Sequence, residues 1–292
     1  METAELLKKV RKIEIKTKGL SNHIFSGEYH STFKGRGMSF SEVREYHFGD
    51  DIRNIDWNVT ARFNAPYVKV FEEERELTLM LLVDVSPSAY FGTLGQLKNE
   101  LMAEICAVLA FSATKNNDKV GLLFFSDKIE LFIPPKKGKS HILRLIREIV
   151  AYKPQSKTQT DIAFALKHYN NLIKKRSIVF LLSDFIAAGY QKDLGLAARK
   201  HDLIGLRIYD PIEQQLPQVG MLQVSDTETD QHRWLDTNNA AERKAWHQYY
   251  QTYLQYCTTA FVQSAADLIN ISTDQHRKPY TNELIRFFQK RR

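Results

Sequence analysis

The sequence has few cysteines and no long hydrophobic run. Its two cysteines, Cys106 and Cys257, lie in helical patterns far apart in a chain of 292 residues. This spacing fits neither a disulfide framework nor a zinc site, so we expect a reduced, cytoplasmic protein with two buried thiols. The longest apolar run, Ile105 to Phe111, is much shorter than the roughly twenty residues of a membrane-spanning helix, so we expect no membrane span.

Other signals are missing as well. The amino terminus lacks a basic start followed by an apolar stretch, so the sequence predicts no secretory signal. No glycine-rich loop ending in Lys-Ser or Lys-Thr has P-loop spacing, which argues against a nucleotide triphosphatase of that class. The basic residues are not interleaved with aromatic residues, and no nucleic-acid motif accompanies them. Nucleic acid is therefore an unfavoured partner.

The net charge of +7 is unevenly distributed along the chain. Residues 134–176 hold eleven basic side chains against two acidic ones, whereas residues 1–76 are balanced. The simplest interpretation of the basic segment is a solvated helix face. An acidic protein partner is the next interpretation, ahead of nucleic acid or anionic lipid.

From residue 77 onward, strand patterns alternate with helix patterns. The alternation predicts a Rossmann-like α/β fold, with a mostly parallel sheet and helices on both faces. Three residues, 126–128, separate two of the strands, so these form a hairpin with one antiparallel edge strand. The expected strands are 77–83, 119–125, 129–133, 177–182, 202–208 and 268–272. The expected helices are 94–115, 139–151, 161–174, 190–200, 239–264 and 281–290.

Residues 1–76 lack this alternation, and we expect an N-terminal extended arm before a domain at 77–292. The first thirty residues open with an amphipathic helix pattern. Residues 31–63 are rich in glycine, arginine, aspartate and aromatics, which predicts an extended layer held by side-chain pairing. Residues 67–71 alternate and are predicted to form a strand leading into the first central strand.

Charged residues cluster in the segment with the Gly-Asp-Asp and Asp-Trp elements. Asp50, Asp51 and Asp56 lie close in sequence to Arg53 and Arg62. Because an unpaired buried charge is costly, we expect a paired network. The network could fix the arm to the sheet, or it could form a docking surface for a partner. For the second interpretation, the candidate partner-binding residues are Arg44, Asp51, Arg53 and Asp56.

The segment Asp84-Val85-Ser86-Pro87-Ser88 directly follows the first central strand. Its Asp and two Ser, at alternate positions, supply three hard oxygen ligands that suit Mg²⁺ or Mn²⁺. Two further fragments, Thr160-Asp161 and Ser183-Asp184, open a helix and follow a strand. A parallel α/β sheet gathers such segments at the carboxyl edge of its strands. The sequence therefore predicts a metal-ion-dependent adhesion site with these ligands: Asp84, Ser86, Ser88, Thr160 and Asp184.

Each fragment also has a simpler interpretation. Ser86 or Ser88 could cap a helix, Asp161 could cap the helix that it opens, and Asp184 could be a turn residue. Only the presence of all three fragments, in this order and context, favours the metal site over these alternatives.

Two assignments within the site have competitors. Thr158 competes with Thr160 as a ligand, because it lies two residues earlier. Asp84, at a strand end, could be a phosphate-accepting nucleophile. Many enzymes of that kind carry a second aspartate two residues later, where this chain has Ser86, so we assign no catalytic residue.

The sequence resembles a known family at these elements. The run Gly-x-Gly, Phe, Arg-x-Tyr, Gly-Asp-Asp-x-Arg-x-Ile-Asp-Trp and Ala-Arg, then Asp-x-Ser-x-Ser, Thr-Asp-Ile and Leu-Ser-Asp-Phe, is similar to the domain-of-unknown-function 58 family of bacterial proteins. The resemblance covers the chain from about residue 25 and implies a von Willebrand factor A-like domain. Some members carry transmembrane helices before this region, and this chain resembles the short soluble form. The family's metal motif is matched by Asp84, Ser86, Ser88, Thr160 and Asp184.

The family is typically associated with MoxR-type AAA+ ATPases. The resemblance therefore implies a non-enzymatic, Mg²⁺-dependent protein-binding module that acts with such an ATPase in chaperone-like assembly or regulation. Its ligand would be an acidic protein, whose carboxylate reaches the ion. The alternative is a metal-dependent hydrolase or phosphotransfer enzyme that uses the same metal.

Overall fold

The computed structural model describes residues 38–63, 65–73, 77–93, 96–153, 159–225 and 232–291. Contacts divide the chain into two compact units, a small one that covers Tyr29–Leu77 and a large one that runs from Thr78 to the carboxyl terminus. The helix predicted in the first thirty residues, the Gly-x-Gly element at 35–37 and Thr158 lie outside the described residues.

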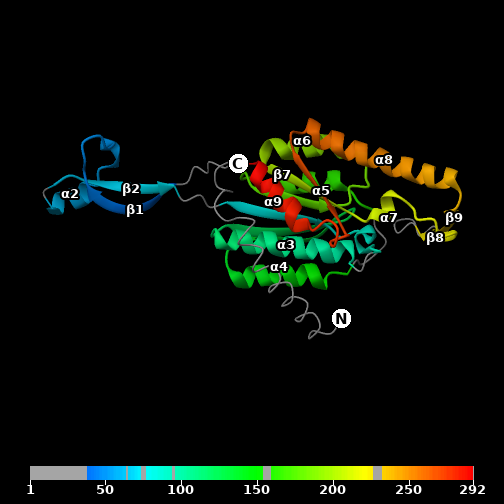
Figure 1. The fold of residues 1–292 in the computed structure, drawn as a ribbon. Coiled ribbons are helices and arrows are strands. Elements are labelled where there is room, and N and C mark those ends of the chain that lie inside the picture. The colour runs from blue at the N-terminus through cyan, green and yellow to red at the C-terminus, as the bar shows by residue number, and fades with distance from the viewer. Residues whose placement is uncertain are drawn as a thin grey trace. The chain divides into compact units, whose positions relative to one another are not determined.

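The large unit is built on a six-stranded sheet with the strand order β10-β7-β6-β3-β4-β5 (Figure 1). Five strands run parallel: β3 (Thr78–Asp84), β4 (Lys119–Phe125), β6 (Ile178–Ser183), β7 (Asp202–Tyr209) and β10 (Asp267–Ser272). The sixth, β5 (Ile129–Lys136), follows β4 through a short turn and pairs with it in the antiparallel direction at one edge. The predicted mostly parallel sheet with one antiparallel edge strand is confirmed.

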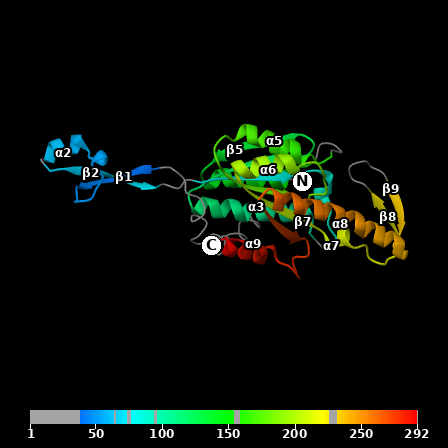
Figure 2. The ribbon, with the colours of Figure 1, turned by 90° about the horizontal axis from the view of Figure 1, so that it is seen from above.

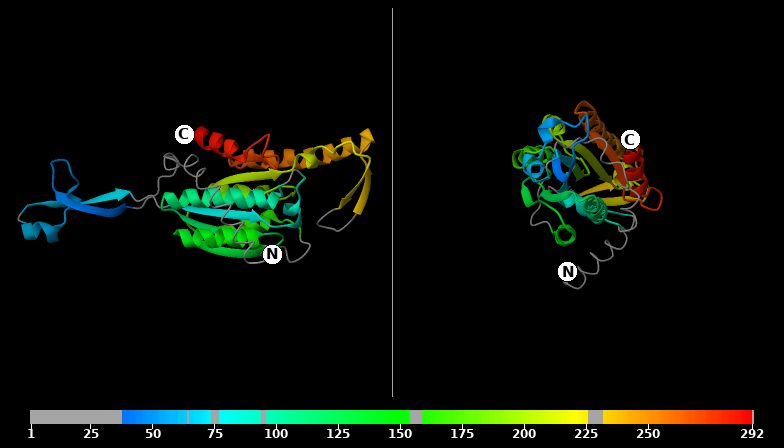
Figure 3. Two further views of the ribbon diagram at one scale, coloured as in Figure 1. Left: turned by 60° about the horizontal axis from the view of Figure 1, so that its bottom comes forward. Right: turned by 90° about the vertical axis from the view of Figure 1, so that its left-hand side faces the viewer.

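Helices cover both faces of this sheet, as predicted. They are α3 (Lys98–Lys115), α4 (Lys139–Ala151), α5 (Ile162–Leu172), α6 (Gln191–Lys200), α8 (Ala240–Gln263) and α9 (Tyr280–Lys290). Helix α3 packs against α4 in one layer, and α6 packs against both α5 and α8 in the other. Figures 2 and 3 show the sheet between these two helix layers.

The central strands are apolar along their whole length because both of their faces are covered. Strand β6 shows this best, since all six of its residues are buried. Val179 and Leu181 belong to the core under α5, α6 and α8. Phe180 points to the opposite layer, where its ring lies 6.4 Å from that of Phe288 in α9.

Short elements complete the large unit. A 3-10 helix, η3 (Pro87–Tyr90), follows β3, and helix α7 (Pro211–Gln214) follows β7. Strands β8 (Met221–Ser225) and β9 (His232–Asp236) form a separate antiparallel pair before α8. None of the helices in the described ranges is long and apolar enough to cross a membrane.

The basic segment 134–176 includes a solvated helix face, as its simplest interpretation predicts. Helix α4 buries Ile142, Leu145 and Ile146. Arg144 and Arg147, on the other side of the same helix, are exposed.

The small unit is a two-stranded sheet with a helical insertion. Strand β1 (Met38–Glu45) pairs antiparallel with β2 (Tyr67–Glu73), and η2 (Ile52–Asn54) and α2 (Trp57–Phe63) lie between them in sequence. The strand predicted at 67–71 exists, but its partner is β1. The extended layer predicted for 31–63 is wrong at α2, because Asp56 accepts hydrogen bonds from the amides of Asn58 and Val59 and so starts a helix.

A buried hydrogen-bond chain joins α5 to the amino-terminal ends of β6 and β7. The hydroxyls of Tyr169 and Ser177 lie 2.5 Å apart, and Ser177 Oγ lies 2.8 Å from His201 Nδ1. His201 is 1% exposed, and its Nε2 has no hydrogen-bond partner among the described residues. A proton on Nε2 would therefore bring an unsolvated charge into the core.

Acid should therefore destabilise the large unit through His201. Burial, together with the charges of Lys200 and Arg176, lowers the pKa of His201 from 6.5 to about 4. Because the folded pKa lies below the unfolded one, this stability is complete above the unfolded pKa and falls as the pH drops toward the folded one. At pH 5 the loss is about 2 kcal/mol. Urea unfolding of wild type and His201→Phe at neutral and acidic pH measures it; an equal pH dependence in both proteins contradicts it.

Candidate metal centre

The fragments predicted to hold a metal meet at the carboxyl edge of the central strands. Strand β3 ends at Asp84, and the neighbouring strand β6 ends at Ser183, just before Asp184. Ser183 Oγ donates a hydrogen bond of 2.6 Å to Asp84 Oδ2. The two aspartates are close enough for the charge of Asp184 to raise the pKa of Asp84. The parallel register of β3 and β6 therefore brings these carboxylates together.

The loop after β3 folds back on Asp84. The amide of Ser86 donates to Asp84 Oδ1 at 3.0 Å, and the hydroxyl oxygens of Ser86 and Ser88 lie 3.1 Å apart. Ser88 also contacts Asp184, and this hydrogen bond helps to lower the pKa of that carboxyl. Ser86 precedes η3, but its side chain makes no capping hydrogen bond. The simpler interpretation of Ser86 as a helix cap is therefore wrong.

Thr160 reaches the same edge through its neighbour. The amide of Asp161 donates to the carbonyl of Ser126, which follows β4 and lies beside the end of β3. Asp161 Oδ1 accepts from the amide of Phe164 and caps α5, so the simpler interpretation is correct for this residue. Thr160 Oγ1 is buried and has no hydrogen-bond partner among the described residues. A buried hydroxyl in that state is free to bind a ligand.

A buried lysine that the sequence analysis missed completes the site. Lys98, at the start of α3, is fully buried, and its Nζ lies 3.0 Å from Asp184 Oδ2 and 2.7 Å from Glu213 Oε1. The other oxygen of Asp184 accepts from the amide of Ile186. Both oxygens of Asp184 therefore have protein partners. The bond to the amide two residues later also makes Asp184 a turn residue, as its simpler interpretation predicted.

The sequence does carry a signal for Lys98. Leu101, Met102 and Ile105 lie three, four and seven residues later on the same helix, and all are buried. That spacing places Lys98 on the face of α3 that contacts the core. A lysine on such a face needs buried acids, and the candidates stand at the ends of β6 and β7.

Burial and charge shape the ionisation of these carboxyls. Burial, and then the charge of Asp184, raises the pKa of Asp84 to about 6. Burial also raises the pKa of Glu213. For Asp184, burial acts in the same direction, but the ammonium of Lys98 outweighs it and leaves the pKa below its usual value. One ammonium therefore satisfies only part of the negative charge at this edge.

A count of the charges at this edge gives the size of the deficit. Asp84 and Asp184 are buried and the Glu213 side chain is 15% exposed; when ionised they carry three negative charges, against the single positive charge of Lys98. Two further buried charges, Arg207 on β7 and Asp210 just after it, are opposite in sign and leave the sum unchanged. The ionised edge therefore carries a net charge of −2, which one divalent cation neutralises.

The family follows from a comparison with known proteins. Residues 42–254 match the family described as protein of unknown function DUF58. The chain belongs to this family. The strand order and the single antiparallel edge strand of this DUF58 protein confirm the predicted von Willebrand factor A-like fold.

Among its relatives, an uncharacterised protein of Mycobacterium bovis is 28% identical over 232 residues, which cover 78% of this chain and 73% of the relative. The crystal structure of an aerotolerance-related membrane protein from Bacteroides fragilis aligns with a TM-score of 0.47 and 14% identity, over 72% of this chain and 99% of that one. The VWA domain of SpRpn10 aligns with a TM-score of 0.36 and 10% identity, over 74% and 95% of the two chains.

In the small unit of the DUF58 chain, the charged residues form separate pairs. Arg44 binds Asp50 through two hydrogen bonds of 2.8 Å, and Arg53 Nη2 lies 2.8 Å from Asp51. Asp56 lies 3.4 Å from the ammonium of Lys69. The expected burial of this network is wrong: Arg53, for example, is 88% exposed. Exposed pairs of this kind stabilise a protein by about 1 kcal/mol or less.

Proposed function

We propose that this protein is a protein-binding module whose contact with its partner depends on a divalent cation, Mg²⁺ or Mn²⁺, at the carboxyl edge of the sheet. The observation that carries the proposal is the pair of neighbouring buried carboxylates, Asp84 and Asp184, with a single ammonium that pairs only with Asp184 and Glu213. Leaving two net negative charges buried is costly. A bound cation removes that cost.

The oxygen donors fit such an ion. Asp84 and the hydroxyls of Ser86, Ser88 and Thr160 are hard ligands, and Thr160 Oγ1 has no other partner in the described part of the chain. Asp184 contributes its charge, because one of its oxygens is paired with the ammonium of Lys98, whereas the oxygens of Asp84 accept only from the neutral groups of Ser86 and Ser183. The cation supplies an electrophilic position for an incoming oxygen.

This donor set favours binding over catalysis. Three of the four proposed direct ligands are neutral hydroxyls, so the ion keeps most of its positive charge and attracts an acidic group of a partner protein. A metal-dependent hydrolase or phosphotransfer enzyme is the second candidate, because Asp84 stands at a strand end. The position two residues later is Ser86, which cannot act as the acid and base that such an enzyme needs.

The partner class is a further part of the proposal. The family resemblance implies a MoxR-type AAA+ ATPase, and the metal implies an acidic protein ligand. A pull-down of such an ATPase, with and without a chelator, tests the module as a whole. Loss of the complex on chelation, with no turnover of phosphoesters, supports the binding role. Metal-dependent turnover that Asp84→Ala removes supports the enzyme instead.

Replacing Ser86 and Ser88 together by alanine should weaken Mg²⁺ or Mn²⁺ binding at least tenfold with little loss of stability. The two hydroxyls bond to each other, so removing both leaves no orphaned partner between them. Calorimetric titration with each metal measures the affinity. Ser126→Ala, at the same edge but outside the ligand set, is the matched control. Unchanged affinity in the double variant contradicts the assignment of both ligands.

A further inference from the structure

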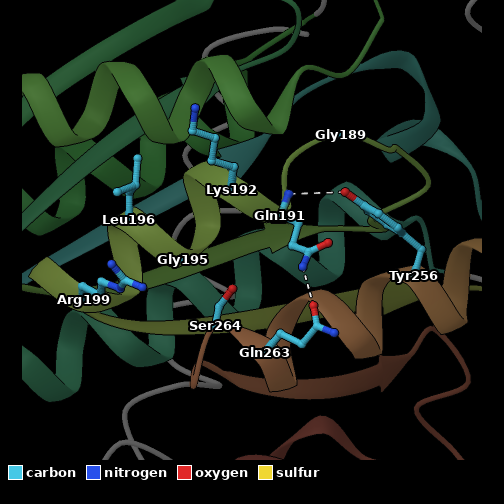
Figure 4. Close-up of a pocket in the computed structure, with 9 residues that line it drawn as sticks. All are labelled: Gly189, Gln191, Lys192, Gly195, Leu196, Arg199, Tyr256, Gln263 and Ser264. Carbon is cyan, nitrogen blue, oxygen red and sulfur yellow. Dashed lines mark hydrogen bonds between the residues drawn. The ribbon is translucent and has the colours of Figure 1, made fainter.

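A polar groove lies between α6 and the carboxyl-terminal end of α8 (Figure 4). Its volume is about 550 Å³, and it shares no residue with the metal centre. It is lined by Gly189, Gln191, Lys192, Gly195, Leu196, Arg199, Tyr256, Gln263 and Ser264. Nothing in the proposed metal-dependent function uses this surface.

One wall of the groove carries two cations. Lys192 and Arg199 are both exposed and stand seven residues apart on α6, which separates them by about 10 Å along the helix. Leu196 lies between them on the same face and is 50% exposed. Neither cation forms an ion pair within the described ranges, and no acidic residue lines the groove. Asp193, the acid in the first turn of α6, lies outside the lining.

The opposite wall is neutral and fixed in place. The side chain of Gln191 donates to Gln263 Oε1 across the groove, and the amide of Gln191 donates to the hydroxyl of Tyr256 at 3.3 Å (Figure 4). The two helices also lie close together at Gly195, where a side-chain carbon would be in ordinary contact with Ser264 Oγ at 3.5 Å. Hydrogen bonds therefore connect the two walls of the groove before any ligand binds.

This chemistry selects the kind of ligand. Two cations in a groove whose lining contains no acid repel metal ions and attract carboxylates. The half-exposed Leu196 between them can contact one apolar side chain of the ligand. An extended peptide advances about 3.3 Å per residue and alternates its faces, so acidic residues four positions apart lie on one face about 13 Å apart, within reach of the two long cationic side chains.

We propose that the groove binds an acidic segment of a partner protein. Two carboxylates of the segment pair with Lys192 and Arg199, and an apolar side chain between them covers Leu196. This contact is independent of the metal centre, so a chelator does not affect it. The groove is then a second surface of the protein that binds negatively charged groups.

The test uses a fluorescein-labelled peptide with two glutamates four positions apart and a leucine midway between them, so that all three side chains share one face of an extended chain. Fluorescence anisotropy with the full chain should show saturable binding that weakens as salt is added and is unchanged by chelator. The double charge reversal Lys192→Glu with Arg199→Glu should weaken binding more than tenfold. Failure of the metal-dependent function leaves this result intact, because chelator is present in one arm of the measurement.

Two controls make the result decisive. The double variant Lys167→Glu with Lys244→Glu makes the same change in net charge at exposed positions on α5 and α8, and it should bind within twofold of wild type. The same peptide with glutamines in place of glutamates should not bind. Equal binding of the glutamine peptide, equal loss in both double variants, or preferential binding of a single-stranded oligonucleotide overturns the proposal.

Discussion

Without metal, Asp84→Asn protein should resist urea better than wild type near neutral pH. Asp84 is buried, faces Asp184 and has a pKa of about 6, above the ordinary 3.8. Because the folded pKa is the higher one, wild type is most stable at low pH and loses stability as the pH rises through the folded pKa. The loss at neutral pH is about 3 kcal/mol at most. Asparagine removes the charge and with it this loss.

The hydrogen bonds of Asp84 survive the replacement. An asparagine oxygen still accepts from the amide of Ser86, as Oδ1 does now. The asparagine NH₂ meets Ser183 Oγ, which currently donates to Asp84 but can also accept. We therefore expect a net gain of about 1–3 kcal/mol in the free energy of unfolding of the metal-free variant.

Mg²⁺ should reverse this order. A cation that binds only the folded protein stabilises it by about 4.1 kcal/mol at a thousandfold excess over its Kd, which exceeds the expected advantage of about 1–3 kcal/mol of the variant. Wild type should gain that stability, and Asp84→Asn should gain none, because its metal affinity falls by more than a hundredfold. Urea unfolding with chelator and with saturating Mg²⁺ measures both effects. A metal-free variant that is weaker than wild type and still stabilised by Mg²⁺ contradicts the role of Asp84.

Asp118→Asn is the matched control for this experiment. Asp118 is also a buried aspartate, but it precedes β4 and lies at the opposite edge of the sheet. Its replacement should leave the response to Mg²⁺ as large as in wild type. If both variants lost their stabilisation by Mg²⁺, the loss would come from a general disturbance of the fold and not from the removal of a metal ligand.

The sheet and the site loops were predictable because local signals specify them. The apolar runs before Asp84 and Asp184 are strands that are covered on both faces, and each ends where its first acid appears. Strand β5 runs past its predicted end at residue 133 to Lys136, through Pro134 and Pro135. Prolines are tolerated there because an edge strand leaves some amides unpaired.

Strand β1 lies within the extended layer predicted for 31–63, but it was not predicted as a strand because its alternation is broken. Met38 and Phe40 are two residues apart, but the next apolar residue, Val43, falls out of step. The pairing with β2 shifts register between Phe40 and Glu42, so a bulge absorbs the extra residue. A period-two pattern cannot be recognised across such a shift.

Lys98 was missed for a different reason, which is the distance of its partners along the chain. Asp184 and Glu213 lie 86 and 115 residues away, and only the assembled sheet brings them to the start of α3. The helical spacing locates Lys98 on a buried face, but it does not identify the acids that accept its charge. Pairings of this kind depend on the order of the strands, which local periodicity does not contain.

Lys98→Met should be strongly destabilising when metal is absent. The methionine keeps the apolar length of the side chain but leaves Asp184 and Glu213 buried without their ammonium. Breaking a buried pair in this way costs about 3–5 kcal/mol. Lys115→Met, at the exposed end of the same helix, should change stability by about 0.5 kcal/mol or less. Urea unfolding in the presence of chelator compares the two variants.

The response of Lys98→Met to metal separates a role in charge from a role in packing. With the ammonium gone, the carboxylates attract a divalent cation more strongly, so Mg²⁺ should restore more stability to the variant than it adds to wild type. Adding Glu213→Gln removes one of the three acids, so the metal-free double variant should regain part of the loss, and its gain from Mg²⁺ should return toward the wild-type value. A Lys98→Met protein as stable as Lys115→Met, with an unchanged response to Mg²⁺, would mean that the lysine acts only through the bulk of its side chain. The two net negative charges at the carboxyl edge would then have no part in holding an ion.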